Sequence, residues 1–242
     1  MFLNFTAFME SVYYIPLFTC TLSIIFSIQL YRHWRTKKQS LYLFWWMLGV
    51  LTFGAGTFTE SFNTLTGWHE WNFKAWYITG ALLGGAPLAQ GTVYLLLKRR
   101  TANILTAIFL TLVIIASTCV VLSPVDRSKV EPMRFSGNVF VWQWVRYFSP
   151  FINLYAMIFL VGGAIYSAIL YFSKKGSSVR AWGNVMIAVG ALLPGIGGSA
   201  TRLGHVEVLY ITEFIGLCLI FSAYLVMKKD SASSVHVAQS AA

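Results

Sequence analysis

Two glutamates lie within apolar segments of this sequence, and they are its best candidates for proton chemistry. Glu60 follows a run of glycine and threonine in "FGAGTFTESF" (53–62), and Glu213 lies in "LYITEFIGLC" (209–218). A charged side chain at the middle of a bilayer costs about 2.5 to 3.5 kcal/mol or more, so each carboxyl group must be paired, protonated or hydrated. Two such groups in one partly desolvated site could exchange a proton or bind a cationic or hydroxyl-rich solute.

The residues around Glu60 predict a polar helix face. At 100° per residue, one side of a helix over this segment carries small and polar side chains, with Phe53 as the only large exception. That face consists of Gly49, Thr52, Gly56, Thr57, Glu60, Asn63 and Thr64. It must contact protein or water, because lipid offers no hydrogen bonds to these groups. We therefore predict a water-accessible cavity, open to the outside, that is formed by Glu60, Glu213, Arg202, Thr57, Tyr77 and Tyr210.

Other roles are open for the same residues. Glu60 could be an interfacial carboxylate that is salt-bridged to Arg202 or to Lys74. Gln90, in the inner half of the next apolar segment, is a further candidate for the binding site, because its amide could contact a substrate. The same amide could instead serve as a hydrogen-bonded link between helices, which contributes about 0.6 kcal/mol on average.

Two apolar segments contain glycines next to a proline. Pro87 ends "GALLGGAP" (80–87), and Pro194 lies in "GALLPGIGGSA" (190–200). Proline removes a backbone hydrogen bond within a helix, so both segments could be interrupted where a bundle must flex or expose its backbone to a ligand. Glycine and proline are also common in ordinary membrane helices, so such interruptions could be without function.

The histidines, aspartates and cysteines of the sequence do not form a pattern that predicts catalysis or a metal centre. His69 with Glu70 and His205 with Glu207 lie at the outer ends of apolar segments, where exposure to solvent is expected, so they are weak metal candidates. None of the four histidines is clearly intramembrane and no aspartate lies in an apolar segment, which removes the ligands of a membrane hydrolase or a haem site. The three cysteines lie in separate segments without CxxC spacing, which favours neither disulfides nor thiolate sites. We expect no enzyme activity and no cofactor.

The composition predicts a polytopic membrane protein. Hydrophobic residues make up 57% of the chain, charged residues 11%, and the mean hydropathy is +0.66, which is too apolar for an ordinary soluble domain. Seven segments approach the roughly 20 apolar residues that a crossing helix needs, and the first, which lacks the basic region of a cleavable signal peptide, is expected to act as its own insertion signal. We expect one all-α bundle over 1–229 and a disordered cytoplasmic tail over 230–242. The seven helices are expected near 11–31, 41–64, 73–97, 102–123, 147–172, 182–202 and 206–227.

The basic residues predict the orientation of the bundle. Loops that remain in the cytoplasm retain Lys and Arg during insertion. With the N-terminus outside, twelve of the eighteen basic residues fall on the inner side. They are Arg32, Arg35, Lys37, Lys38, Lys98, Arg99, Arg100, Lys174, Lys175, Arg180, Lys228 and Lys229. An N-out, C-in topology follows, and the net charge of +10 is explained by topology and by affinity for anionic headgroups, without nucleic acid as a partner.

Short motifs recur in the same order in the two halves of the chain. "YYIP" (13–16) opens the first helix and "YFSP" (147–150) opens the fifth, while "YIT" occurs at 77–79 and again at 210–212. These matches predict that helices one to three are repeated as helices five to seven in parallel orientation, with helix four as a linker. Aromatic residues also recur by chance at membrane interfaces, which is the alternative.

This 3+1+3 bundle resembles the architecture of SWEET-type carriers and of microbial opsins. The opsin resemblance would imply a retinal-binding lysine in the seventh helix, but "LYITEFIGLCLIFSAYLVM" (209–227) contains none. The SWEET-type resemblance implies prolines in helices one and five, which Pro16 and Pro150 match only at the outer ends, and the Pro-Gln dipeptide of those carriers is absent. Residues 44–62 and 73–97 also resemble helices two and three of the seven-helix sensor regions that precede bacterial histidine kinases.

Two functions are consistent with these features. The first is a small-solute or proton-linked carrier with an outward-facing polar cavity, which the repeat, the interrupted helices and the two glutamates favour. The second is a membrane sensor or an accessory subunit of a larger complex, whose short basic inner loops would dock a membrane-protein partner. A sensor needs an output domain and the tail is short, so we favour the carrier. Its expected partners are the lipid bilayer and a small-molecule ligand, and its expected location is the cell membrane, as a multi-pass protein of a bacterial inner membrane.

Overall fold

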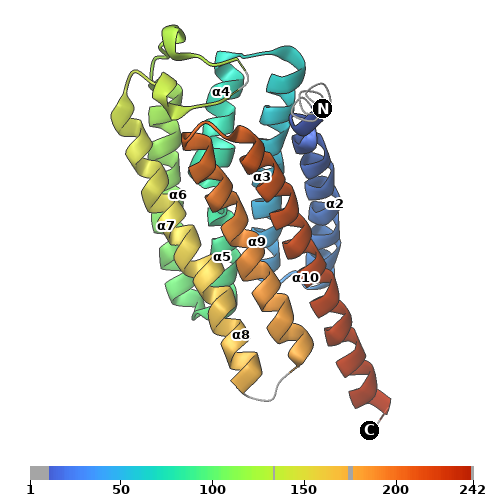
Figure 1. Ribbon diagram of the computed structural model, residues 1–242. Helices are drawn as coiled ribbons and strands as arrows, with labels where there is room; N and C mark the ends of the chain where they lie inside the picture. Colours follow the sequence, from blue (N-terminus) through green and yellow to red (C-terminus); the bar gives the residue numbers. More distant parts are fainter. Residues whose placement is uncertain (1–10, 133, 174–176, 241–242) are drawn as a thin grey trace.

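The computed structural model describes residues 11–132, 134–173 and 177–240, and these form a bundle of helices (Figure 1). Within these residues no strand occurs, only the isolated bridges Val125–Phe140 and Glu131–Arg134. The long helices are α2 (Ile15–Thr36), α3 (Leu41–Thr66), α6 (Arg99–Leu122), α9 (Ser178–Arg202) and α10 (Val206–Ser240). Two further stretches each consist of three shorter helical pieces. The first is formed by α4 (Glu70–Trp76), the π-helical η1 (Tyr77–Leu83) and α5 (Ala86–Leu96). The second is formed by α7 (Phe148–Ala156), the π-helical η5 (Met157–Gly162) and α8 (Gly163–Ser173). Between α6 and α7 lie the short 3-10 turns η2 (Arg127–Lys129), η3 (Gly137–Val139) and η4 (Gln143–Tyr147).

Six helices in the described part of the chain are long and apolar enough to cross a membrane. They are α2, α3, α6, α9, the stretch from η4 to α8, and α10 as far as Asp230. The predicted all-helical fold is confirmed, and its apolar helices are consistent with an integral membrane protein. The stretch of α4, η1 and α5 is also helical, but no single piece of it reaches that length. Helix α10 continues to Ser240, through most of the segment for which the sequence predicts a disordered tail, and residues 241–242 lie outside the described part.

The helices form a closed ring. α2 packs on α3, α3 on the stretch from α4 to α5, α5 on α7 and η5, α8 on α9, α9 on α10, and α10 returns to α2. Helix α6 lies at the edge of this ring, where it packs on α5 and η1. We call the end of the bundle that carries residues 123–147 the loop end, and the opposite end, from which α10 projects, the tail end (Figure 1).

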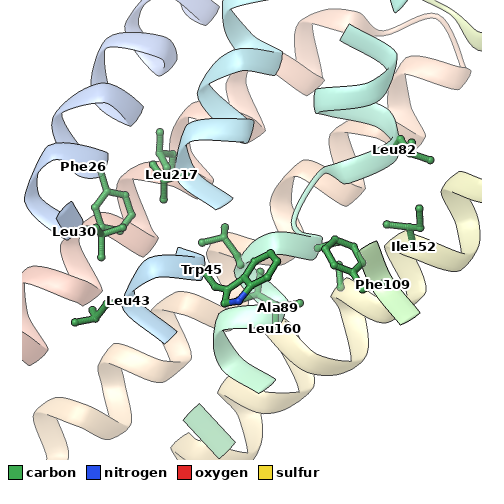
Figure 2. Close-up of a cluster of buried hydrophobic side chains, with 14 of the residues drawn as sticks. Phe26, Leu30, Leu43, Trp45, Leu82, Ala89, Phe109, Ile152, Leu160 and Leu217 are labelled. Atoms are coloured by element: carbon green, nitrogen blue, oxygen red, sulfur yellow. The ribbon is translucent and has the colours of Figure 1, made fainter. Parts of the chain in front are cut away.

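Large apolar side chains from most helices meet in the middle of the bundle. Figure 2 shows the centre of this core, which contains Phe26, Leu30, Leu43, Trp45, Leu82, Ala89, Phe109, Ile152, Leu160 and Leu217. Phe109 joins α6 to the core, because its ring packs against those of Trp45 and Tyr155 at centroid distances of 6.2 Å and 5.7 Å. The opposite face of α6 exposes large apolar side chains, including Ile108 and Ile114, as a helix that faces lipid would.

Helices α9 and α10 make the most extensive helix contact, because one face of α9 carries glycine every seven residues. We call Gly183, Gly190 and Gly197 the glycine stripe. A Cβ atom added to Gly190 would lie 2.7 Å from the carbonyl oxygen of Gly216. One added to Gly197 would lie 2.7 Å from the Cα atom of Leu209. The stripe therefore lets the two backbones touch, and this contact places the part of α10 that carries Glu213.

Pro194 does not interrupt α9, so the predicted break in this segment is wrong. Proline cannot donate a hydrogen bond to the carbonyl group four residues earlier, which leaves the oxygen of Gly190 without its helical partner. That oxygen faces Gly216 of α10, where an added Cβ atom would be only 2.5 Å away. The proline and the glycines together serve the close packing of α10.

The other predicted interruption, within 80–87, is confirmed. Helix α4 widens into η1, the chain turns at Gly84 with a φ of +42°, and α5 begins with Pro87 in its first turn. Glycine suits a positive φ because it has no Cβ atom. Nδ2 of Asn153 in α7 donates to the carbonyl oxygen of Ala81 at 3.1 Å, which satisfies one of the backbone groups near the break.

Candidate functional site

Glu60 of α3 and Glu213 of α10 meet inside the bundle, toward its loop end. Their carboxyl groups lie near enough to interact electrostatically. The Glu60 side chain is 4% exposed, and its Oε1 atom accepts a hydrogen bond from Nε1 of Trp76 at 2.9 Å. An ionised carboxylate can only accept, so a hydrogen bond between two carboxyl groups requires a proton on one of them. We call Glu60 and Glu213 the carboxyl pair.

One oxygen of each glutamate is available for that proton. Oε2 of Glu60 and Oε2 of Glu213 are buried, and neither has a hydrogen-bond donor among the described residues. No lysine, arginine or histidine in the described ranges forms an ion pair with either group. The two carboxyl groups would repel each other if both were ionised, so the arrangement favours a proton on one of them.

Two further predicted site residues lie next to the carboxyl pair along its helices. Tyr210 is one turn before Glu213, is 4% exposed, and lies close enough to interact electrostatically with both carboxyl groups. Thr57 is one turn before Glu60, and its hydroxyl group donates to the carbonyl oxygen of Gly54 at 3.1 Å. The hydroxyl proton of Thr57 is therefore already used within α3.

Two other predicted site residues, Arg202 and Tyr77, form no hydrogen bond or ion pair with the carboxyl pair in the described part of the chain. Arg202 ends α9, is exposed, and pairs with no carboxylate in the described part of the chain. The buried hydroxyl group of Tyr77 accepts a hydrogen bond from Oγ of Ser149 at 3.2 Å and interacts electrostatically with two arginines, Arg146 and Arg202. The described residues thus show no ion pair between Arg202 and the carboxyl pair.

The alternative in which Glu60 is salt-bridged is not observed. Lys74 pairs with Glu70 at 3.0 Å and also donates to the carbonyl oxygen of Val121. Trp76, which was not among the predicted site residues, is the hydrogen-bond partner of Glu60 instead. The available signal was its indole N–H group, which is a donor only and must find an acceptor when it is buried in an apolar segment.

Gln90 lies far from the carboxyl pair, in a polar network that joins α5, α6 and α7. It is fully buried, its Nε2 atom donates to the hydroxyl oxygen of Thr106 at 2.7 Å, and its Oε1 atom accepts from the hydroxyl group of Tyr155. The network continues from Thr106 to the hydroxyl oxygen of Tyr94 at 3.0 Å and from Tyr94 to Asn103 at 2.8 Å. Because both ends of the Gln90 amide are bonded to protein, the geometry favours the link between helices over the substrate contact.

The side chains predicted as weak metal ligands already contact neighbouring groups of the protein. Nδ1 of His69 lies 3.0 Å from the carbonyl oxygen of Gly67, and Nδ1 of His205 lies 2.9 Å from Oε1 of Glu207. Glu70 is engaged by Lys74. Within the described ranges, no three His, Cys, Asp or Glu side chains are grouped so that they could hold a metal ion.

Two hollows in the described part of the molecule do not reach the carboxyl pair. One has a volume of about 600 Å³ and is lined by Trp68, His69, Glu70, Trp71, Lys74, Val121 and Arg127. The other has a volume of about 510 Å³ and is lined by Ser128, Lys129, Glu131, Asn138 and Gln143. Both hollows belong to the loop end, so neither is the cavity that the sequence predicts around Glu60.

A cluster of aromatic side chains at the loop end packs around Trp76, the hydrogen-bond partner of Glu60. We call Phe73, Trp76, Tyr77, Phe135 and Phe140 the aromatic cap. The ring of Phe135 lies 5.2 Å from that of Trp76, and the ring of Phe140 lies 4.8 Å from that of Tyr77. Trp76 therefore connects the two features, since its ring packs against that of Phe135 and its N–H group donates to Glu60.

Comparison with known proteins assigns this chain to no family. No protein-family model matches the chain, and no curated protein or solved structure is detectably similar to it.

Proposed function

We propose that this chain is a proton-linked carrier of a small solute, with seven membrane passes of which α4, η1 and α5 together form the third. The contact between Glu60 and Glu213 carries this proposal. With the shared proton the two groups attract, and without it two buried negative charges repel. Gain or loss of the proton would therefore shift α10 relative to α3, which is the kind of coupling that a carrier needs.

The interrupted third pass supports the same proposal. Trp76 bonds to Glu60 and is followed directly by η1, which ends at the turn of Gly84. A change at the carboxyl pair would thus act on the irregular, π-helical part of the neighbouring helical stretch. Since the Glu60 side chain and Oε2 of Glu213 are buried, we assign this conformation to an occluded state of the carrier.

The test is uptake into vesicles that contain the purified protein. Vesicles are incubated in a mixture of small metabolites with an acidic outer solution, and the enclosed solutes are identified by mass spectrometry. The wild type is expected to concentrate at least one solute only when the pH gradient is present. Glu213→Gln is expected to abolish this uptake, because the amide keeps the shape of the side chain and cannot release the proton. Glu70→Gln is the matched control, since Glu70 lies at the surface and is expected to be dispensable.

Two results would contradict the carrier. One is that no solute accumulates with the wild type, and the other is that Glu213→Gln accumulates solutes as the wild type does. A loss of uptake together with a loss of expression in Glu213→Gln would assign the carboxylate a structural role instead.

In this proposal the loop end faces outward and the tail end faces the cytoplasm, because most basic residues lie near the tail end. A cysteine placed at Lys37, in the exposed turn between α2 and α3, is then expected to resist a membrane-impermeant maleimide added to intact cells. A cysteine placed at Lys129, exposed at the loop end, is expected to react and is the control. The three native cysteines are first replaced by serine. Labelling at position 37 with protection at position 129 would reverse the orientation.

The parallel repeat is part of the same proposal. Pro16 lies in the first turn of α2 and Pro150 in the first turn of α7, and Tyr77 and Tyr210 are both buried toward the loop end. Superposition of the two halves is expected to bring each of these pairs together.

The shape of α10 favours a second candidate function, that of a sensor or accessory subunit. This helix has 35 residues, and its last turns project beyond the other helices at the tail end (Figure 1). A helix that continues out of the bundle could transmit a movement at Glu213 to a partner. A partner protein that co-purifies with the chain, together with the absence of any solute uptake, would favour this function over the carrier.

A further inference from the structure

The hollow of about 600 Å³ at the loop end lies between the start of α4 and the end of α6. Glu70, Trp71 and Lys74 of α4 line it together with Val121, in the last turn of α6, and Arg127 of the turn η2. Lys74 connects the two helices, because its Nζ atom pairs with Oε1 of Glu70 at 3.0 Å and donates to the carbonyl oxygen of Val121 at 3.0 Å. We call this feature the α4–α6 hollow.

The side chains of the α4–α6 hollow carry an excess of positive charge. Lys74 and Arg127 are cationic, and Glu70 is the only carboxylate among the described residues that line it. Glu70 pairs with Lys74, whereas the exposed Arg127 forms no ion pair within the described ranges. Guanidinium groups bind phosphate in bidentate geometry. The hollow therefore suits a ligand group with a single negative charge, such as a phosphodiester.

The position of the α4–α6 hollow is that of a lipid headgroup. Helix α6 is long and apolar enough to cross a membrane, and the hollow adjoins its last turn. Trp68 and Trp71 line the same hollow, and the Trp71 side chain is 57% exposed. Tryptophan is enriched at the membrane–water interface, at the level of the headgroups. The phosphate groups of the surrounding lipids are thus expected at the level of Arg127.

An apolar stripe of α6 leads from the hollow along the helix. Val121, Ile114 and Leu110 are 55%, 64% and 42% exposed, although all three are large and apolar. Residues four and seven positions apart lie on one side of a helix, so these three side chains form a continuous surface. Acyl chains can lie along this stripe while the headgroup of the same lipid fills the hollow.

We propose that the α4–α6 hollow binds an anionic phospholipid, with its phosphodiester against Arg127 and Lys74 and its acyl chains along the apolar stripe of α6. This site is separate from the carboxyl pair, and the inference goes beyond the proposed function without depending on it. A zwitterionic phospholipid offers the same phosphate but brings a further positive charge to a hollow that already has one in excess. The anionic lipid is therefore expected to bind more tightly.

The test uses the full chain in phosphatidylcholine nanodiscs that contain a small fraction of a phosphatidylglycerol analogue with a photoreactive diazirine near the headgroup. Illumination attaches the analogue to the residues that it contacts, and mass spectrometry of the peptides locates them. Attachment is expected within residues 68–74 and 121–127. A phosphatidylcholine analogue with the same acyl chains and the same diazirine is the lipid control, and it is expected to attach there about fivefold less.

Arg127→Gln is expected to reduce attachment of the phosphatidylglycerol analogue at these residues about fivefold and to leave that of the phosphatidylcholine analogue unchanged. Lys129→Gln is the matched control, since it also removes one exposed positive charge at the loop end but lines the other hollow and pairs with Asp126. It is expected to behave as the wild type. Peptides from the tail end, where other basic residues attract anionic lipids, are the internal control and are expected to be labelled alike in all variants.

Three results would overturn the inference. The first is equal attachment of the two analogues at the hollow, and the second is unchanged attachment in Arg127→Gln. The third is displacement of the analogue by glycerol phosphate, which carries the phosphate group without acyl chains and is expected not to compete. That third result would assign the hollow to a soluble phosphate ester and remove the role of the apolar stripe.

Discussion

Replacing Gly190 or Gly197 with alanine is expected to push α10 away from α9 and to lower the melting temperature of the purified protein. The added Cβ atom would lie 2.7 Å from a backbone atom of α10 in both cases, the carbonyl oxygen of Gly216 or the Cα atom of Leu209. A backbone cannot turn aside as a flexible side chain can, so the two helices must separate. Overpacking of this kind costs about 1 to 3 kcal/mol, and the cost is read from the unfolding midpoint in detergent.

Alanine at Gly195 or Gly198 is the matched control on the same helix. A Cβ atom at either position meets no other atom within 4 Å. Alanine is also more favourable than glycine inside a helix by roughly 0.5 to 1 kcal/mol, so these variants are expected to melt at the same temperature as the wild type or higher. If all four variants melted alike, close packing through the glycine stripe would not be what holds α10.

Raising the pH is expected to destabilise the folded protein, and Glu213→Gln is expected to remove this dependence. Because two enclosed carboxylates would repel each other, we expect the folded protein to hold a proton on the carboxyl pair, whereas glutamates of the unfolded chain in water are ionised at neutral pH. The folded state thus binds more protons than the unfolded state, so the free energy of unfolding must fall as the pH rises. In Glu213→Gln the amide is a permanent donor for Glu60, and no proton has to be held.

The measurement is the melting temperature of each variant from mildly acidic to mildly alkaline pH. Glu70→Gln is the control, because it removes a surface carboxylate paired with Lys74 and leaves the carboxyl pair intact. We expect this control to keep the wild-type slope. A slope that persists unchanged in Glu213→Gln would mean that the contact between Glu60 and Glu213 holds no proton.

The sequence by itself determined the fold class and the position of most helices. The second helix was expected at 41–64 and is observed at Leu41–Thr66, and the interruption within 80–87 was expected from its glycines and proline. These features are local. A helix in lipid must be apolar along its length and must satisfy its own backbone, and both conditions can be checked within one segment.

Only the tertiary structure decided which polar groups meet. Spacing along a helix shows which residues share a face, but the rotation of each helix about its axis depends on neighbours that are distant in the sequence. The glycine stripe turns one face of α9 toward α10, which is why Pro194 packs without breaking the helix. For the same reason Glu60 and Glu213 lie near each other while Arg202 is exposed at the end of α9, although all three were expected in a single site.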